Sequence, residues 1–304
     1  MTSEIASKHQ KHPQTNTWIV GCGDIGKRVA ALLATEDQRQ AQNLKAIVSS
    51  AESVEHCRQC NIDSYALDLD SHYSLDGFNF DQADLFYFAP PTPSGTEDLR
   101  LKQFLQNLGS AKPRRIVLIS TTGVYGDSAG EWIDENTAVN PKAERAIRRL
   151  SAEQTLQTWS EKTDSEFMIL RVPGIYAKER LPLERLKKGL PVINADEAGY
   201  TNRIHADDLA QACVAAMNCE FSNEIINVTD GNPSTMTDYF NNVADFAGLP
   251  RPPQISLEAA EKTLSAGMVS YMKESRRIRN DKMLGSLKIK LRYPDLKTTL
   301  QRSV

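Results

Sequence analysis

Three glycines near the amino terminus have the spacing of a phosphate-binding turn. The segment from Gly21 to Gly26 reads GCGDIG, which fits the pattern GxGxxG, and it follows a short apolar run directly. In this pattern the first glycine allows a tight turn, the second lets a pyrophosphate approach the backbone, and the third lets a helix pack closely on a strand. Amides at the start of the helix then bind the anion. We therefore expect Gly21, Gly23 and Gly26 to bind a dinucleotide; a glycine-rich turn without a ligand is the alternative.

Asp24 and Ile25 complete the turn, and we count both as cofactor-binding positions because their backbone opens the helix. The carboxylate of Asp24 is an unfavourable neighbour for a pyrophosphate. Its side chain is therefore expected to cap the helix or to point away from the ligand.

The corner that would hold the adenosine ribose has no acid at the expected place. An acidic residue about 20 positions beyond the glycines binds the ribose hydroxyls of NAD. Here the second apolar run ends in Ser49 and Ser50, and the next acid is Glu52. Neutral serines tolerate the 2′-phosphate of NADP, so the corner favours NADP over NAD. Positive charge for that phosphate would come from one of three basic residues, Lys27, Arg28 or Arg58.

Short apolar runs that end in turn residues alternate with helical patterns along the chain. Strands that are apolar on both faces and separated by helices indicate a parallel sheet covered on both sides. The fold class is thus α/β, with a doubly wound Rossmann-type sheet of about seven strands. Asp68, near the end of the third run, is expected near the adenine, with a strand-end cap as the equal alternative. The predicted strands span 17–20, 44–48, 65–69, 85–89, 116–120, 167–172 and 225–228, with helices at 99–108, 143–159 and 207–217.

After Asp230 the pattern changes to helical segments at 236–249 and 257–264, with prolines between them and a basic stretch beyond. We interpret this part as a smaller lobe, interleaved with the sheet domain because the seventh strand follows a first visit to the lobe. The expected units are a flexible tail at 1–16, an NAD(P)-binding domain at 17–180 and 203–230, and a small, mainly C-terminal substrate lobe at 181–202 and 231–304.

Composition narrows the class of partner. Of the 304 residues, 40% are apolar and 25% charged, and 36 Lys and Arg meet 39 Asp and Glu, for a net charge of -3. Nucleic-acid binders usually show a basic excess, so a small molecule is the expected partner. No apolar run approaches the roughly 20 residues that cross a bilayer. The polar first 16 residues lack the apolar stretch of a secretory signal, which points to the cytoplasm.

The five cysteines are odd in number and scattered, so no disulfide framework is expected. Cys57 and Cys60 have the spacing of half a zinc site. Because a zinc site needs four ligands and only His56 lies close by, we interpret the pair as ordinary helix cysteines and expect no metal.

Four later segments, taken with the glycine turn, resemble the extended short-chain dehydrogenase/reductase superfamily in its NAD-dependent epimerase/dehydratase branch. The resemblance runs from residue 17 to about 293 and implies an NAD(P) cofactor. It implies that Thr121 binds the reacting oxygen, that Pro173 lies by the nicotinamide, and that Ala89 and Pro90 line the cofactor site. A hydroxyl at the end of a strand also faces the crevice where doubly wound folds bind ligands. The four segments read APP at 89–91, STTGVYG at 120–126, RVPGIY at 171–176 and IHADD at 204–208.

The chain departs from that family at the catalytic base. The family has a Tyr, a Lys four residues later and usually a Glu four beyond, and an alignment on Glu153 places Arg145 and Arg149 at the first two positions. Arg149 is a candidate to hold a ribose hydroxyl, whereas an arginine cannot act as a base because it keeps its proton. The alternative is a solvated helix face, with i,i+4 ion pairs from Glu144 to Arg148 and from Arg149 to Glu153.

Two tyrosines are candidate proton donors beside Thr121. Tyr125 is close to Thr121 in sequence and Tyr176 follows Pro173. Either phenol would serve if a nearby arginine, 145 or 149, lowered its pKa; packing in the core is the alternative.

Other basic residues suggest an anionic substrate. Arg203 is suited to clamp a phosphate or carboxylate. His205 with the following Asp207 and Asp208 is expected to cap a helix. A further run at Arg276, Arg277 and Arg279 is either a surface feature or a phosphate site.

Two functions follow. The first is an NAD(P)-dependent oxidoreductase or epimerase-like enzyme acting on a sugar nucleotide or related phosphorylated small molecule, with a homodimer left open. The second is a non-catalytic NAD(P)-binding sensor or regulatory protein, motivated by Arg145 and Arg149.

Overall fold

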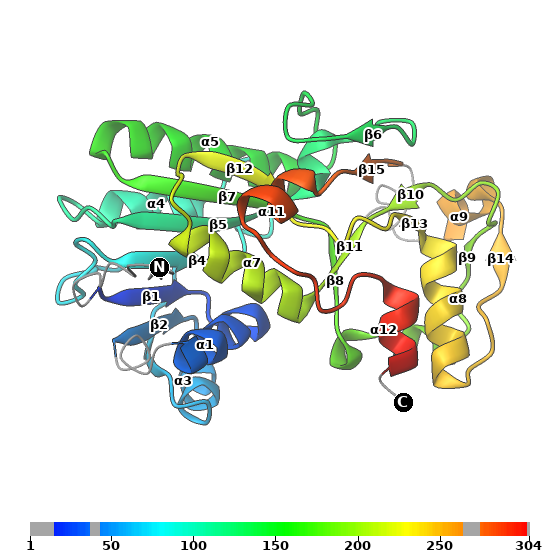
Figure 1. The fold of residues 1–304 in the computed structure, drawn as a ribbon, viewed down its shortest axis with the longest axis horizontal. Helices are drawn as coiled ribbons and strands as arrows, with labels where there is room; N and C mark the ends of the chain where they lie inside the picture. Colours follow the sequence, from blue (N-terminus) through cyan, green and yellow to red (C-terminus); the bar gives the residue numbers. More distant parts are fainter. Residues whose placement is uncertain (1–14, 37–42, 264–273, 303–304) are drawn as a thin grey trace, which may run out of the picture.

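A computed structural model describes residues 15–36, 43–263 and 274–302. The expected tail therefore lies, apart from its last two residues, outside the described part of the chain. The centre of the fold is a seven-stranded sheet in the order β12-β7-β5-β4-β1-β2-β3, and every neighbouring pair in it is parallel (Figure 1). Its strands are β1 (Thr17–Val20), β2 (Leu44–Val48), β3 (Asp63–Ala66), β4 (Asp84–Tyr87), β5 (Arg115–Thr121), β7 (Glu166–Val172) and β12 (Glu224–Asn227).

All seven predicted strands are present, which confirms the doubly wound α/β fold. The largest displacement is in the third, which was expected at 65–69 and spans 63–66. This strand lies at the edge of the sheet and most of its residues are exposed, so its apolar pattern is a poor guide to its limits.

Helices cover both faces of the sheet, and successive residues of β1 show the two layers (Figure 1). Ile19 packs in one core with helices α1 and α7, whereas Trp18 and Val20 pack in a second core with α4 and α5. This alternation follows from the period of two along a strand. The helices of this part are α1 (Asp24–Glu36), α3 (Ala51–Arg58), α4 (Leu99–Asn107), α5 (Glu144–Thr163) and α7 (Ala206–Asn218).

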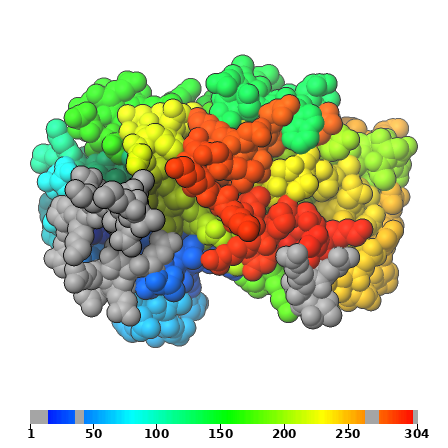
Figure 2. All heavy atoms as spheres, in the orientation of Figure 1, coloured from blue at the N-terminus to red at the C-terminus, as the bar shows by residue number. Residues whose placement is uncertain are grey.

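A smaller group of elements has a core of its own, which includes Val192, Phe240 and Leu300. The residues after 274 cross one face of the molecule, from α7 to α8 (Figure 2). The helices here are α6 (Leu183–Lys187), α8 (Met236–Ala247), α9 (Leu257–Thr263), α11 (Asp281–Ser286) and α12 (Leu296–Arg302). Paired short strands are β6 (Trp132–Ile133) with β15 (Arg277–Ile278), β8 (Gly174–Tyr176) with β11 (Arg203–His205), β9 (Val192–Ile193) with β14 (Gln254–Ile255), and β10 (Tyr200–Thr201) with β13 (Ser234–Thr235).

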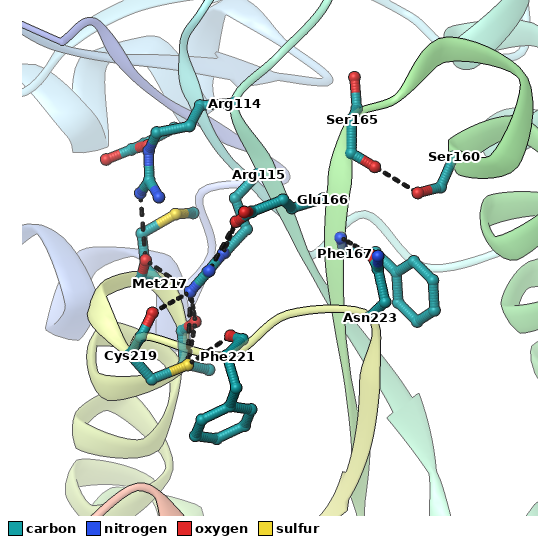
Figure 3. A network of polar contacts seen from close by, with 12 residues as sticks. Arg114, Arg115, Ser160, Ser165, Glu166, Phe167, Met217, Cys219, Phe221 and Asn223 are labelled. Atoms are coloured by element: carbon teal, nitrogen blue, oxygen red, sulfur yellow. Dashed lines mark hydrogen bonds and ion pairs between the residues drawn. The ribbon is translucent and has the colours of Figure 1, made fainter.

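Two arginines at the start of β5 hold the carboxyl end of α7 (Figure 3). Arg115 is buried and donates to the carbonyls of Ala216, Met217 and Cys219 at 2.8–3.1 Å, and Arg114 donates to Met217 at 3.1 Å. The last carbonyls of a helix have no partner within it, so the guanidinium groups satisfy them. This network lies on the side of the sheet where the strands begin, opposite the side where their carboxyl ends lie.

Among the described residues, no helix has both the length and the apolar character needed to cross a bilayer.

Candidate functional site

The glycine turn lies between β1 and α1, at the edge where the strands end. Gly21 has φ +86°, and a Cβ there would lie 2.4 Å from the Ala89 nitrogen, so the turn packs directly on the end of β4. A Cβ on Gly26 would lie 3.1 Å from Ile19 Cγ2, so α1 packs closely on β1. At Gly23 a Cβ would meet nothing within 4 Å. Packing within the chain thus explains two of the three glycines, and the third borders open space that a ligand can enter.

Asp24 stands in the first turn of α1 and pairs with two arginines. Its carboxylate accepts from Arg28 at 2.9 Å and from Arg180 at 2.8 Å. Partial burial raises the pKa of Asp24, but hydrogen bonds from Arg180 and Arg28 outweigh it and lower the pKa overall. The carboxylate is therefore ionised at neutral pH.

The ribose corner at the end of β2 is neutral, as its sequence indicates. Ser49 and Ser50 are exposed, and the Ser50 hydroxyl accepts from the Ser53 amide at 3.2 Å as the N-cap of α3. Arg58, at the far end of α3, pairs with Glu55. Arg28 pairs with Asp207 and Glu179 as well as Asp24. Both arginines named for a 2′-phosphate are thus bound to carboxylates elsewhere.

The segments after β3 and β4 make local turns. Asp68 accepts from the Asp70 amide at 3.0 Å, which is the strand-end cap named as the alternative to an adenine contact. The Ala89 amide donates to Val20 at 3.0 Å, so this segment lies beside the glycine turn. The carbonyl of Pro90, next to it, accepts from Arg100 at 2.9 Å.

Thr121 is the last residue of β5 and is half-buried. Its hydroxyl oxygen accepts from the Gly123 amide at 3.2 Å, as the N-cap of the 3-10 turn η1 (Thr122–Tyr125). That bond leaves the hydroxyl proton available for a substrate oxygen. Pro173, directly after β7 on the neighbouring strand, is half-buried too, and the pairing of Thr121 with Val172 places the two ends side by side.

Neither candidate tyrosine has the environment of a proton donor. The Tyr125 hydroxyl is buried and donates to Asn227 at 2.8 Å, and burial raises its pKa despite the nearby Arg171. The Tyr176 hydroxyl is 3.3 Å from Thr299 Oγ1, and burial raises its pKa well above the usual value. Neither phenol has the lowered pKa that was expected, because both hydroxyl groups are buried in the interior of the protein. Both side chains pack in the core.

The two arginines at the family's Tyr and Lys positions differ from each other. Arg145 is exposed, which agrees with the solvated helix face named as the alternative. Arg149 turns inward and donates to the Ile119 carbonyl at 3.1 Å, and burial lowers its pKa although Asp98, Tyr87 and Glu153 act against that. The expected pair of Arg149 with Glu153 does not form, whereas Arg148 does lie 3.6 Å from Glu144.

Glu153 belongs to a buried network that sequence reasoning missed. It accepts from Arg171 at 2.7 Å and from the Ser120 hydroxyl, and all three residues are buried. The guanidinium of Arg171 also lies 4.8 Å from the Tyr125 ring. An arginine inside an otherwise apolar strand was the available signal. The network holds the end of β5, and so Thr121, against α5.

The residues around β11 are structural. His205 caps α7 as expected, because its Nδ1 accepts from the Asp207 amide at 3.2 Å, and burial lowers its pKa. Asp208 accepts from the amides of Arg292 and Tyr293 at 2.8 and 2.9 Å, which anchors the C-terminal segment. Arg203 is buried with its guanidinium 3.6 Å from the Tyr239 ring.

The basic run near the C-terminus separates into three environments. Arg276 is buried and donates to Gly126 and Glu274. Arg277 donates to Gly130 at 2.6 Å and lies between the rings of Trp132 and Tyr200. Of the three, Arg279 alone projects as an exposed cation, 4.0 Å from Asp281. Arg276 and Arg277 thus make structural contacts within the chain, and the surface alternative describes Arg279 alone of the three.

Cavities and metal ligands add little to this site. A hollow of about 850 Å³ lies by the end of α5 and the start of β7, away from the glycine turn. A cavity of about 230 Å³ lies beside Arg28, Glu179 and Tyr293. In the described residues no three His, Cys, Asp or Glu side chains are grouped to hold a metal ion. All five cysteines are free thiols; Cys57 lies in α3 and Cys60 just beyond its end.

Comparison with known proteins agrees with the fold. Residues 99–229 match the NAD dependent epimerase/dehydratase family. Protein YeeZ of Escherichia coli is 25% identical over 91% of this chain and 96% of its own length. A putative UDP-glucose 4-epimerase of Methanocaldococcus jannaschii is 25% identical over 42% of this chain, a match that spans 45% of that protein.

Solved structures extend the likeness to nearly the whole chain. A functionally unknown conserved protein from Silicibacter pomeroyi has 27% identity and a TM-score of 0.80, over 94% of this chain and 97% of that one. The UDP-glucose 4-epimerase of Thermotoga maritima, solved with UDP-glucose, has 17% identity and a TM-score of 0.75 over 94% and 98%. The resemblance inferred from the motifs is thus confirmed: residues 99–229 match the NAD dependent epimerase/dehydratase family, and the chain shares the fold of these solved structures.

Proposed function

We propose that this chain binds a nicotinamide dinucleotide across the edge where the strands end, with the pyrophosphate on the amides that open α1. The observation that carries this is Gly23, where a Cβ would meet nothing within 4 Å, although packing requires the two flanking glycines. The first amides of a helix have no partner within it and attract anions. The family match supports the same cofactor class.

The remaining cofactor contacts are assigned by position. Ser49 and Ser50 would face the adenosine ribose, and their neutrality favours NADP. Because Arg28 and Arg58 have carboxylate partners, a 2′-phosphate would depend on the serine hydroxyls and the amides that open α3. The full set is Gly21, Gly23, Asp24, Ile25, Gly26, Ser49, Ser50, Asp68, Ala89, Pro90, Thr121, Arg149 and Pro173.

Gly23→Ala tests this binding site. The added methyl fits the folded chain but occupies the space that a pyrophosphate would enter, so we expect unchanged thermal stability and a loss of NADH and NADPH affinity of at least about tenfold. Fluorescence titration measures the affinity. Gly285→Ala, where a Cβ also meets nothing within 4 Å, is the matched control. Equal affinities for wild type and Gly23→Ala would rule out this location.

Hydride transfer on a sugar nucleotide or related phosphorylated compound is the second candidate function. Thr121 favours it, because its half-buried hydroxyl ends β5 with the proton still available. Bound nicotinamide would supply the hydride chemistry, and Thr121 would polarise the substrate oxygen. Since Tyr125 and Tyr176 are committed to the core, the proton would come from another group or from water.

Thr121→Val separates an enzyme from a sensor. If the protein turns over UDP-sugars or simple carbonyl compounds, this change should lower kcat by about 100-fold, because general-acid or hydrogen-bond assistance is worth that much. The dinucleotide affinity should change far less than kcat, because the other assigned cofactor contacts remain. A wild type that binds the dinucleotide and turns over none of these compounds would instead support the sensor or regulatory function.

A further inference from the structure

One ion-pair network joins the phosphate-binding turn to the path into the smaller lobe. Asp24, the fourth residue of the turn, accepts from Arg180 at 2.8 Å. Arg180 ends the short 3-10 turn η2 (Lys178–Arg180), which follows β8 and precedes α6. The two side chains are 36% and 38% exposed, so solvent and solutes reach this pair.

The other arginine on Asp24 is held much more firmly. Arg28 pairs with Asp24, with Glu179 and with Asp207 at the start of α7, and is 21% exposed. Arg180 forms one ion pair within the described residues, and that pair is with Asp24. Release of Arg180 therefore breaks a single exposed pair, which is a weak interaction, whereas release of Arg28 would break three.

A pyrophosphate bound to the amides of the turn would change the electrostatic interactions of Asp24. The amides of Asp24 and Ile25 open α1, whereas the Gly23 amide donates to the Gly21 carbonyl at 2.8 Å, so an anion on the opening amides would lie close to the Asp24 carboxylate. Like charges at that separation repel. A guanidinium binds phosphate oxygens in the same two-point geometry that it uses for a carboxylate, so the pyrophosphate can take the place of Asp24 on Arg180.

We propose that Arg180 exchanges Asp24 for the pyrophosphate of the bound dinucleotide, and so fastens the entrance of the smaller lobe to the cofactor. Asp24 holds Arg180 beside the turn in the free protein and competes with the ligand for it. This assignment rests on the proposed dinucleotide site. It makes Arg180 a positioning residue for the cofactor and Asp24 a residue that limits affinity.

The two charges then have opposite effects on binding. Arg180→Gln removes the cation, and we expect the Kd for NADH or NADPH to rise about tenfold, as for loss of a charged hydrogen bond. Asp24→Asn removes both the repulsion and the competition, and we expect the Kd to fall about threefold. The slope of log Kd against log salt should become shallower in Arg180→Gln, because one fewer cation meets the phosphates.

A matched ion pair elsewhere provides the control. Asp245 and Arg251 lie 2.7 Å apart at the end of α8 and are also exposed. Asp245→Asn and Arg251→Gln should leave the Kd unchanged. Inorganic pyrophosphate serves as a competitor that carries only the proposed contact, and Arg180→Gln should weaken its competition. Adenosine, which has no phosphate, should bind wild type and both variants equally.

The outcomes tell a failure of the exchange apart from a failure of the proposed dinucleotide site. If wild type binds neither dinucleotide, the proposed site and the exchange both fail. If wild type binds and both variants weaken binding equally with an unchanged salt slope, the pair is only a structural link and the exchange is overturned. Thermal melts accompany each titration. If Arg180→Gln does not fold, a fall in Kd for Asp24→Asn supports the exchange and a rise overturns it.

Discussion

Single residues show how strongly burial decides chemical role in this protein. Tyr125 and Tyr176 have the chemical type of a proton donor, yet each hydroxyl lies in the core with a raised pKa. Arg149, on a helix face that reads as polar, is turned inward toward the Ile119 carbonyl. Thr121 differs from the two tyrosines, because it is half-buried at the end of a strand. We therefore propose Thr121, rather than either phenol, as the group that would polarise a substrate oxygen.

At the scale of single residues, Asp230 leads to a prediction of how stability depends on pH. Burial, with Asp208 and Asp295 nearby, raises its pKa to about 7 despite Arg203. A carboxyl group whose pKa is higher in the folded state binds more protons there than in the unfolded state, so its contribution to stability falls as pH rises from about 4 to 7. Asp230→Asn has no ionisable carboxyl group at this position and so does not lose stability in this way as pH rises.

We expect the variant to gain stability over wild type by about 2 kcal/mol more at pH 8 than at pH 5. Urea unfolding at the two pH values measures the difference. The amide oxygen of Asn can still accept from the Asn232 amide, as Asp230 does at 2.9 Å. A stability difference that is the same at both pH values would contradict the raised pKa.

At the scale of elements, the amino ends and the carboxyl ends of the strands carry different kinds of contact. The edge where strands end carries the glycine turn, Thr121 and Pro173, whereas the edge where they begin carries the Arg114 and Arg115 network on α7. Ligand contacts at the first edge and helix capping at the second are thus separable. Substitutions at one edge should leave the other unaffected.

Arg115→Met tests that separation. Loss of the guanidinium leaves the carbonyls of Ala216, Met217 and Cys219 and the carboxylate of Glu166 without this donor, and we expect the free energy of unfolding to fall by about 2–4 kcal/mol. Dinucleotide affinity should not change while the protein is folded. Arg251→Met, which removes one exposed pair, should leave the free energy of unfolding nearly unchanged. A folded Arg115→Met protein that had lost dinucleotide binding would show that the edges are coupled.

At the scale of the whole molecule, two groups of elements share one chain that crosses between them more than once. We propose the units expected from the sequence, a dinucleotide-binding domain at 17–180 and 203–230 and a smaller lobe at 181–202 and 231–304. Separate cores support this division, one set between the sheet and its helices and another around Phe240 and Leu300. Asp208 bridges the two groups, because its carboxylate accepts from the backbone amides of Arg292 and Tyr293 in the C-terminal segment.

The amino-acid sequence by itself determined the seven strands, the glycine turn and the pair of neutral serines after β2, because each depends on residues close together in the chain. Short-range apolar patterns and glycine spacing carry that information directly. The motif at 120–126 likewise predicted where Thr121 would lie.

Only the tertiary structure decided which charged groups meet. Asp24 pairs with Arg180 and Arg28 with Asp207, across 156 and 179 positions of sequence, and Glu153 takes Arg171 in place of the helical neighbour Arg149. The tyrosine hydroxyls likewise found partners in Asn227 and Thr299, more than 100 positions away. Such choices depend on burial and on the packing of remote elements, which a local pattern does not contain.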